Sequence, residues 1–156
     1  MPKSEFRIRY ATRKDIDVLV AQRRKMWQDI MRGELGKFRI DDTQYRKWIK
    51  ETMEKRKFIG IVAVGDEGKI VGSGGVWLRD VHPRPWSSKS AEPYLMSMYT
   101  EPRYRGKGVA TRIVKEAMNW CKKKGYSSAR LHASNLGRRV YSKLGWKRTW
   151  EMRVSL

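Results

Sequence analysis

The feature that most constrains the fold is a strand, a glycine-rich basic turn and a helix in direct succession. The run from Tyr94 to Thr100 is rich in strand-forming residues, and Pro102 ends it. The turn over residues 103–108 carries two glycines and three cations. From Val109 onward apolar residues recur at intervals of three and four, which predicts an amphipathic helix. Together with the order of the other predicted elements given below, this succession predicts a mixed α/β or α+β domain built on one sheet.

A turn of this kind can hold an anion. The first N–H groups of a helix have no partner inside the helix, and the helix dipole places partial positive charge there. Glycines at positions 106 and 108 put no Cβ atom between the backbone and a bound phosphate. The turn is not a Walker loop, and it lacks the third glycine of a dinucleotide fingerprint. A plain turn without a ligand is the alternative interpretation.

Composition narrows the class of protein. The chain has 156 residues, 40% of them hydrophobic, so we expect a single domain over residues 1–156. Its lone cysteine, Cys121, excludes a disulfide within the chain and falls on the apolar side of the predicted helix. No segment has the apolar length of a membrane span, and the N-terminal residues lack the apolar core of a signal peptide. We therefore expect a cytoplasmic protein.

The net charge is unusually high. Thirty-six Lys and Arg against sixteen Asp and Glu give a formal charge of +20. The electrostatic field of so large a positive charge attracts polyanions, so RNA or the ribosome is one candidate partner. A surface adapted to the cytoplasm of the source organism explains the charge equally well, and the two interpretations stay open.

The remaining pattern predicts the other elements. Alternating or buried-type apolar runs and turn residues indicate the strands, and three-to-four spacing indicates the helices. Predicted strands cover residues 6–10, 58–64, 69–79, 94–100 and 127–133, with one or two more over 146–156. Predicted helices cover residues 12–33, 44–57, 109–124 and 136–144, with loops at 33–40 and 80–90. The sheet would have six to seven strands flanked by about four helices.

Two stretches resemble the GCN5-related N-acetyltransferases, the GNAT superfamily. Residues 105–110 match that family's Q/R-x-x-G-x-G/A signature, and a register starting at Arg103 fits as well. Residues 133–146 resemble its later motif, a short helix with a tyrosine before Gly-Phe, although Trp146 replaces the phenylalanine. The order of the predicted elements is also similar to that of the family.

The resemblance implies a sheet splayed between the fourth and fifth strands, with the pantetheine arm of acetyl-CoA entering the gap. Unpaired backbone groups of the fourth strand would bind the arm, and the turn would hold the pyrophosphate. The implied activity is transfer of an acetyl group to a primary amine by direct attack in a ternary complex. The implied cofactor-binding residues are Met98, Thr100, Arg105, Gly106, Lys107, Gly108, Val109, Ala110, Thr111 and Asn135.

The resemblance nominates Tyr141 as the general acid toward the leaving thiolate, and packing of its ring alone is the alternative. The Met98 N–H is the expected oxyanion donor. Asn135 either binds the arm or caps the short helix. Glu92 is the candidate general base, and a water relay is equally compatible. Further candidates for the base are Glu101, Asp29, Glu34, His82 and His132.

The acceptor amine is not identified by the sequence. Residues 27–38, the loop 80–90 and the end of the chain would set specificity, and Trp77, Trp86 and Tyr94 could wall the acceptor pocket. A polycationic amine is disfavoured, because a strongly basic enzyme repels it. The two histidines and one cysteine provide no metal site. A homodimer is an open alternative, and a basic nucleic-acid- or ribosome-binding module on the same fold is the rival function.

Overall fold

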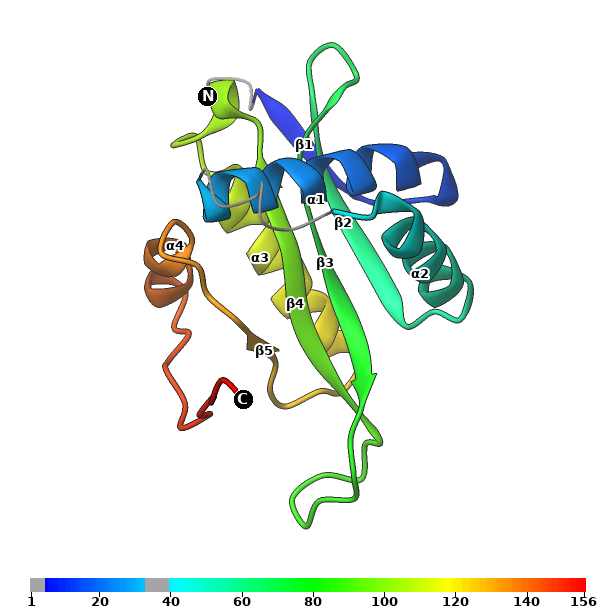
Figure 1. Ribbon diagram of the computed structural model, residues 1–156, viewed down its shortest axis with the longest axis vertical. Helices are drawn as coiled ribbons and strands as arrows, with labels where there is room; N and C mark the ends of the chain where they lie inside the picture. The colour runs from blue at the N-terminus through cyan, green and yellow to red at the C-terminus, as the bar shows by residue number, and fades with distance from the viewer. Residues whose placement is uncertain (1–4, 33–39) are drawn as a thin grey trace.

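The computed structural model describes residues 5–32 and 40–156 (Figure 1). Its centre is one five-stranded sheet in the order β1-β2-β3-β4-β5. The first four strands pair antiparallel, and the fifth runs parallel to the fourth. The strands are β1 (Phe6–Tyr10), β2 (Phe58–Gly65), β3 (Ile70–Asp80), β4 (Ala91–Thr100) and β5 (Arg130–Leu131).

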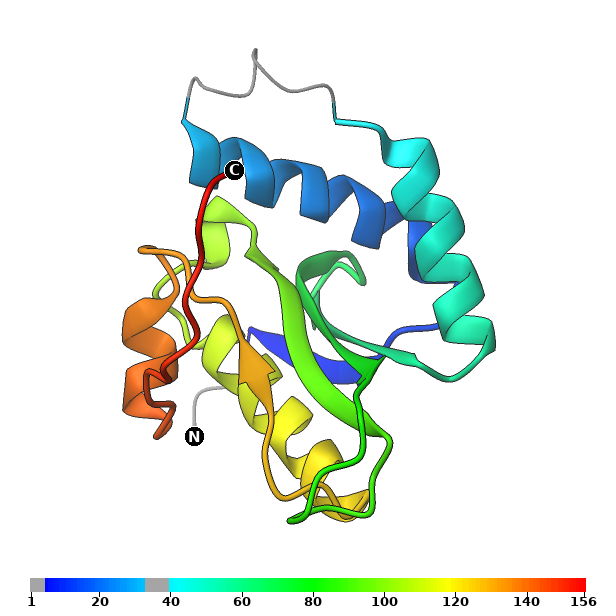
Figure 2. The ribbon, with the colours of Figure 1, turned by 60° about the horizontal axis from the view of Figure 1, so that its bottom comes forward.

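Helices cover both faces of this sheet. The helices are α1 (Ile16–Met31), α2 (Asp42–Glu54), α3 (Val109–Lys123) and α4 (Arg138–Lys143). Short 3₁₀ turns precede α1 and α3, at η1 (Arg13–Asp15) and η3 (Pro102–Tyr104). Figure 2 shows α1 and α2 on one face and α3 on the other, with α4 beside α3. We call the face that carries α1 and α2 the α2 face.

Strand β2 divides the core between the two faces. Phe58, Val62 and Val64 are buried in one cluster with α1 and α2. Ile61 and Ala63, which alternate with them, are buried in the other cluster with α3. This period of two places an unbroken apolar run inside a sheet that is covered on both sides. The predicted mixed α/β fold is confirmed.

The predicted strand count was wrong at the chain end. Residues 146–156 form no strand, and the side chain of Trp150 is 97% exposed. Apolar residues do alternate there, but a strand needs a neighbouring edge with which to pair. Strand β5 is too short to offer that edge, since it covers two residues of the predicted run 127–133. The other predicted helices and strands agree with the structure within a few residues, and the predicted loop at 33–40 lies almost entirely outside the described residues.

The sheet opens between β4 and β5, as predicted. Only Tyr94 with Arg130 and Leu95 with Leu131 are paired across the two strands. From Met96 to Thr100, β4 has β3 along one edge and no strand along the other among the described residues.

A β-bulge interrupts β4 within this open part. Ser97 and Met98 together lie opposite the single residue Gly74, and Ser97 has a φ of 57°. A bulge turns the backbone groups of the bulged strand away from the ladder. This bulge was not predictable from the sequence, because serine is not a residue that signals positive φ.

Candidate functional site

The turn before α3 has the geometry of an anion cradle. Gly106 and Gly108 have φ values of 74° and 85°, and no heavy atom lies within 4 Å of where a Cβ would stand on either. Gly108 is the N-cap and contributes no side-chain cap, and no acidic residue lies in the first turn. Hydrogen bonding within the helix begins with Arg112 N–H donating to the Gly108 carbonyl at 3.0 Å. The preceding N–H groups of α3 have no hydrogen-bond acceptor among the described residues.

The start of α3 is seated closely on the sheet. Val109 is buried, and a Cβ on Gly72 would overlap its side chain. Ala110 and Thr111 are half-buried beside it in the first turn. Gly72 thus allows α3 to pack closely on β3, and this packing positions the cradle relative to β4.

Cations of the turn hold it in place. Arg105 donates from Nε to the Thr100 carbonyl at 2.9 Å and from Nη2 to Asp29 at 2.6 Å. Lys107 donates to Glu5 at 2.6 Å. These contacts tie the turn to β4, to α1 and to the start of β1, so both side chains already have protein partners.

The open edge of β4 holds Met98 and Thr100 where the sequence predicted them. The Met98 side chain packs in the space that a side chain on Gly74 would fill. The Ser97 hydroxyl lies 3.1 Å from the Tyr45 hydroxyl of α2, in hydrogen-bond contact. The bulge therefore connects the open edge with the α2 face, and its backbone is fixed from both sides.

Tyr141 lies on α4, which packs against α3. Its ring packs with the α3 core and makes an edge contact with Trp146 at a centroid distance of 6.2 Å. Its hydroxyl makes no hydrogen bond within the part of the chain that the structure describes. Burial raises the pKa of Tyr141 to about 12, so its hydroxyl keeps the proton at neutral pH.

The turn before α4 bears on the two roles predicted for Asn135, which are binding the pantetheine arm and capping the short helix. The hydroxyl of Ser134 accepts from the Gly137 N–H at 3.2 Å, and the Ser134 carbonyl accepts from the Arg138 N–H at 3.1 Å. Ser134 therefore closes the turn before α4, whose N-cap is Gly137 and has no side-chain cap, so Asn135 does not cap the helix either. Asn135 is exposed at the tip of the turn, where its amide is accessible from solvent.

Glu92 is the centre of an ion cluster. Its side chain is 6% exposed and accepts from Arg79 at 2.9 Å, from Arg84 at 2.8 Å and from Arg130 at 3.0 Å. Burial raises the pKa of this carboxyl, but hydrogen bonds from Arg79 and Arg130 and their charge outweigh it and hold the pKa below its usual range. A carboxylate held in this way is a poor general base.

The two other carboxylates among the described base candidates are also paired with cations. Glu101 accepts from Lys25 at 2.8 Å and from Gln22 at 3.2 Å. Asp29 is paired with Arg105, and the His82 ring lies 2.9 Å from the Pro83 carbonyl. His132 is exposed, and Glu34 lies outside the described residues.

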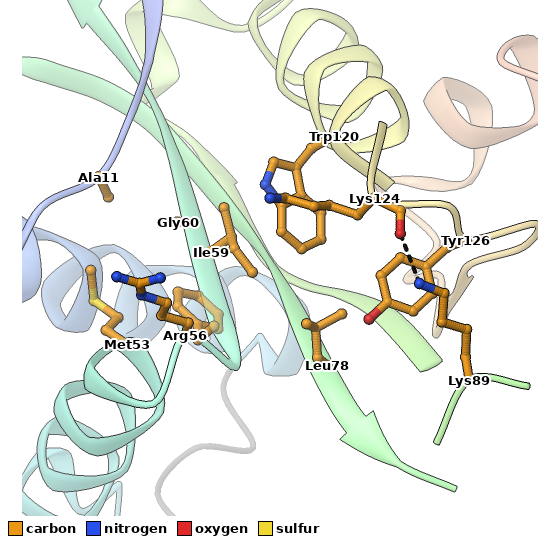
Figure 3. Close-up of a pocket in the computed structure, with 11 residues that line it drawn as sticks. Ala11, Met53, Arg56, Ile59, Gly60, Leu78, Lys89, Trp120, Lys124 and Tyr126 are labelled. Carbon is orange, nitrogen blue, oxygen red and sulfur yellow. Dashed lines mark hydrogen bonds between the residues drawn. The ribbon is translucent and has the colours of Figure 1, made fainter. Parts of the chain in front are cut away.

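A hollow lies elsewhere on the molecule (Figure 3). It has a volume of about 530 Å³ and sits between the ends of α2 and α3, far along the sheet from the cradle. Trp120, Tyr126 and Leu78 line it together with Lys89 and Lys124. No predicted cofactor-binding residue lines this hollow, so it is not the predicted cofactor site.

Residues 5–32 and 40–156 contain neither a candidate metal cluster nor a candidate membrane span. No three His, Cys, Asp or Glu residues there come together to hold a metal ion. No helix there has the length and apolar character needed to span a membrane.

Comparison with known proteins decides the family. Residues 24–146 match the model of the acetyltransferase (GNAT) family. The chain belongs to this family. It is therefore an N-acetyltransferase whose cofactor is acetyl-CoA, as the resemblance implied. The cradle and the open edge of β4 fit that cofactor, since one offers unpaired donors to a diphosphate and the other an unpaired strand edge to an amide-bearing arm.

Several solved structures have the same fold and align with nearly the full length of this chain. A predicted acetyltransferase from Clostridium acetobutylicum with acetyl-CoA is 27% identical, with a TM-score of 0.86 over 97% of this chain and 96% of that one. A GCN5-related N-acetyltransferase from Ralstonia eutropha is 22% identical, with a TM-score of 0.86 over 97% and 98%. An aminoglycoside N-acetyltransferase in complex with CoA is 18% identical, with a TM-score of 0.75 over 100% and 97%. No curated protein matches the chain.

These matches favour the enzyme over the rival nucleic-acid-binding module. They do not bear on an RNA partner, a homodimer or a cytoplasmic location, which stay predictions.

Proposed function

We propose that residues 1–156 act as one domain that transfers an acetyl group to a primary amine by direct attack within a ternary complex. The observation that carries this proposal is the adjacency of the cradle to the open, bulged edge of β4. Family membership and the acetyl-CoA in the Clostridium acetobutylicum structure support it. The buried Cys121 also supports direct attack, since burial raises the pKa of its thiol to about 11 and makes it a poor acyl carrier.

The cofactor supplies an acetyl group activated as a thioester. The N–H groups from Gly108 to Thr111 would bind its diphosphate, helped by the dipole of α3. The backbone of Met98 and Thr100 would bind the arm along the open edge, and the Asn135 amide would bind it from the β5–α4 turn. The Thr100 carbonyl already accepts from Arg105, which keeps this part of the edge rigid.

Two residues would stabilise charge as it develops. The Met98 N–H, placed on the bulge, would donate to the oxyanion. The Tyr141 hydroxyl would donate to the leaving sulfur. Because its pKa is about 12, above the reference value of about 8.5 for a thiol, we expect it to donate a hydrogen bond and not to give up its proton completely.

The amine must lose a proton before it attacks. Each carboxylate proposed as a base is paired with a cation wherever the structure describes it, so we propose that water accepts this proton. The limiting pKa in kcat/KM should then follow the pKa of the acceptor amine when a series of amines is compared. A pKa that stays constant across the series would instead indicate a base on the enzyme.

A screen of amine classes tests the function itself. The protein is incubated with acetyl-CoA and with amino acids, peptides, arylalkylamines, amino sugars or polyamines, and free thiol is measured. We expect thiol release with at least one class, together with a rise in Tm on adding acetyl-CoA. Absence of thiol release with every class would overturn the proposal.

A further inference from the structure

Four aromatic rings form a row across the α2 face. The rings of Tyr45 and Trp48 stack at 5.7 Å, Trp48 meets Trp77 edge-on at 5.5 Å, and Trp77 meets Tyr94 edge-on at 6.3 Å. Tyr45 is buried, whereas the other three rings are half-buried and keep part of their surface open. We call these four residues the aromatic row.

One end of the aromatic row touches the bulge. The Tyr45 hydroxyl lies 3.1 Å from the Ser97 hydroxyl. Ser97 adjoins Met98, the proposed oxyanion donor. The Arg23 guanidinium covers the buried Tyr45 ring at 3.9 Å, so a bound molecule would lie on the other three rings, with one end directed toward the point where acetyl transfer is proposed.

The other end of the aromatic row meets a concentration of positive charge. The Arg79 guanidinium lies 4.4 Å from the centroid of the Tyr94 ring, in cation–π geometry. Arg84 and Arg130 join Arg79 around Glu92. Three positive charges face one negative charge, so this arginine cluster carries a net charge of +2.

Two arginines of the cluster retain the capacity to bind an anion. A guanidinium has five N–H donors, and each arginine here uses one on Glu92, which is its sole side-chain hydrogen bond among the described residues. The side chain of Arg84 is 12% exposed and suffices to neutralise Glu92. Those of Arg79 and Arg130 are 30% and 43% exposed. Their remaining donors form a cationic surface that Glu92 holds in position.

The sheet sets the distance between the two ends. Arg130 pairs with Tyr94, and Tyr94 precedes Met98 by four positions on β4. At roughly 3.3 Å per strand residue, the arginine end and the transfer point are about 13 Å apart, slightly less across the bulge.

We propose that the acceptor is an elongated primary amine with an aromatic body and an anionic group about 13 Å from its nitrogen. The amine would lie at the bulge, the body on the aromatic row and the anionic group against Arg79 and Arg130. This inference rests on the proposed function and names its substrate class. Guanidinium pairs with carboxylate or phosphate oxygens, so either anion satisfies the cluster.

Matched probes test the inference directly. The first probe is 4′-(aminomethyl)biphenyl-4-carboxylic acid, in which two rings separate amine and carboxylate. Its methyl ester removes the charge, and 4-(aminomethyl)benzoic acid shortens the body to one ring. We expect kcat/KM for the biphenyl acid to exceed that for the ester by about tenfold or more, mainly through KM. For 4-(aminomethyl)benzoic acid and its methyl ester, the acid-to-ester ratio of kcat/KM should be less than half of the ratio for the biphenyl pair.

Substitutions in the arginine cluster test whether it causes the preference for the acid over the ester. Arg130→Gln and Arg79→Gln should each reduce kcat/KM for the biphenyl acid about tenfold, while the ester loses less than threefold. The control is Arg7→Gln, which removes an equally charged, exposed side chain from β1 at the other edge of the sheet and should alter neither. Thermal melts verify that all three variants fold.

The outcomes separate this inference from the proposed function. Acetylation of amines with equal rates for acid and ester would overturn the inference and leave the acetyltransferase function intact. An acid preference that survives both arginine variants would also overturn it, because the charge would then be recognised elsewhere. Failure to acetylate any amine would remove the proposed function.

Discussion

The cofactor cradle and the acceptor face are built from different parts of the chain. The cradle consists of backbone: two glycines at positive φ and the uncapped start of α3. The α2 face beside the bulge consists of side chains: the aromatic row and the arginine cluster, which come from five separate elements and loops. The first arrangement suits a feature that every member of a family must share. The second can change residue by residue, so it is the part that sets specificity.

The largest effect should come from breaking the cradle. Gly108→Val places a branched side chain at a φ of 85° where the cofactor diphosphate is proposed to lie. We expect KM for acetyl-CoA to rise at least about a hundredfold, because the Cβ blocks backbone donors. Steady-state kinetics with varied acetyl-CoA measures this.

A matched control separates backbone strain from lost binding. Gly68 has a φ of 75° in the β2–β3 hairpin and is equally open, so Gly68→Val imposes the same strain away from the site. It should lower Tm without raising KM for acetyl-CoA. Equal KM changes in the two variants would show that the cradle does not bind the cofactor.

Removing the Tyr141 hydroxyl tests the side-chain chemistry next to the cradle. Tyr141→Phe should reduce kcat by about a hundredfold, since hydrogen bonding to the leaving sulfur is lost. The dissociation constant of acetyl-CoA, measured by calorimetry, should change less than about threefold. Tyr126→Phe is the control, because Tyr126 is a tyrosine that stacks on Trp120 in the distant hollow. An unchanged kcat in Tyr141→Phe would restrict Tyr141 to packing.

Glu92→Gln asks whether the centre of the arginine cluster acts in catalysis or in structure. Loss of a buried charge that compensates three arginines should destabilise the protein by about 3 kcal/mol. Urea denaturation measures this, with Glu67→Gln as the control, since Glu67 pairs with Lys69 in solvent and should matter by less than about 0.5 kcal/mol. A large fall in kcat for ester acceptors with unchanged stability would make Glu92 the base after all.

The smallest effect concerns Asp15, which pairs with Arg9 at 2.8 Å far from the site. Arg9 lowers the pKa of this carboxyl, chiefly through their hydrogen bond and against the effect of burial. A lowered folded-state pKa contributes stability above the unfolded value, near 4, and that stability is lost as pH falls below it. Asp15→Asn should cost about 1 kcal/mol at pH 6 and less at pH 3.5, as measured by urea denaturation. Equal costs at the two pH values would contradict this.

The cradle was predictable from sequence because it depends on local rules. Glycines at 106 and 108 followed by apolar residues at helical spacing indicate a positive-φ turn into a helix without any knowledge of the fold. The order of strands and helices followed from the same local signals, whereas the opening after β4 was implied by the resemblance alone.

The acceptor face was not predictable in the same way. Arg79, Arg84 and Arg130 are 51 positions apart at the extremes, and nothing local distinguishes them among 36 cations. The pairing of Arg79 with Glu92 and of Arg130 with Tyr94 depends on strand register, which tertiary contacts fix. The same reason made Glu92 look free in sequence and made the chain end look like a strand. Of the residues suggested for the acceptor pocket, Trp77 and Tyr94 lie in the aromatic row, and Trp86 is exposed on the loop.

The brevity of β5 has a consequence for how the molecule responds to occupancy. Two residue pairs, the ion pair of Arg130 with Glu92 and the packing of α4 on α3 fasten residues 130–156 to the rest of the domain. A ligand that hydrogen-bonds both β4 and the β5–α4 turn would hold the segment after β5 against the sheet. Protease cleavage after residue 131 should consequently slow when acetyl-CoA fills the gap, giving a readout of occupancy that requires no turnover.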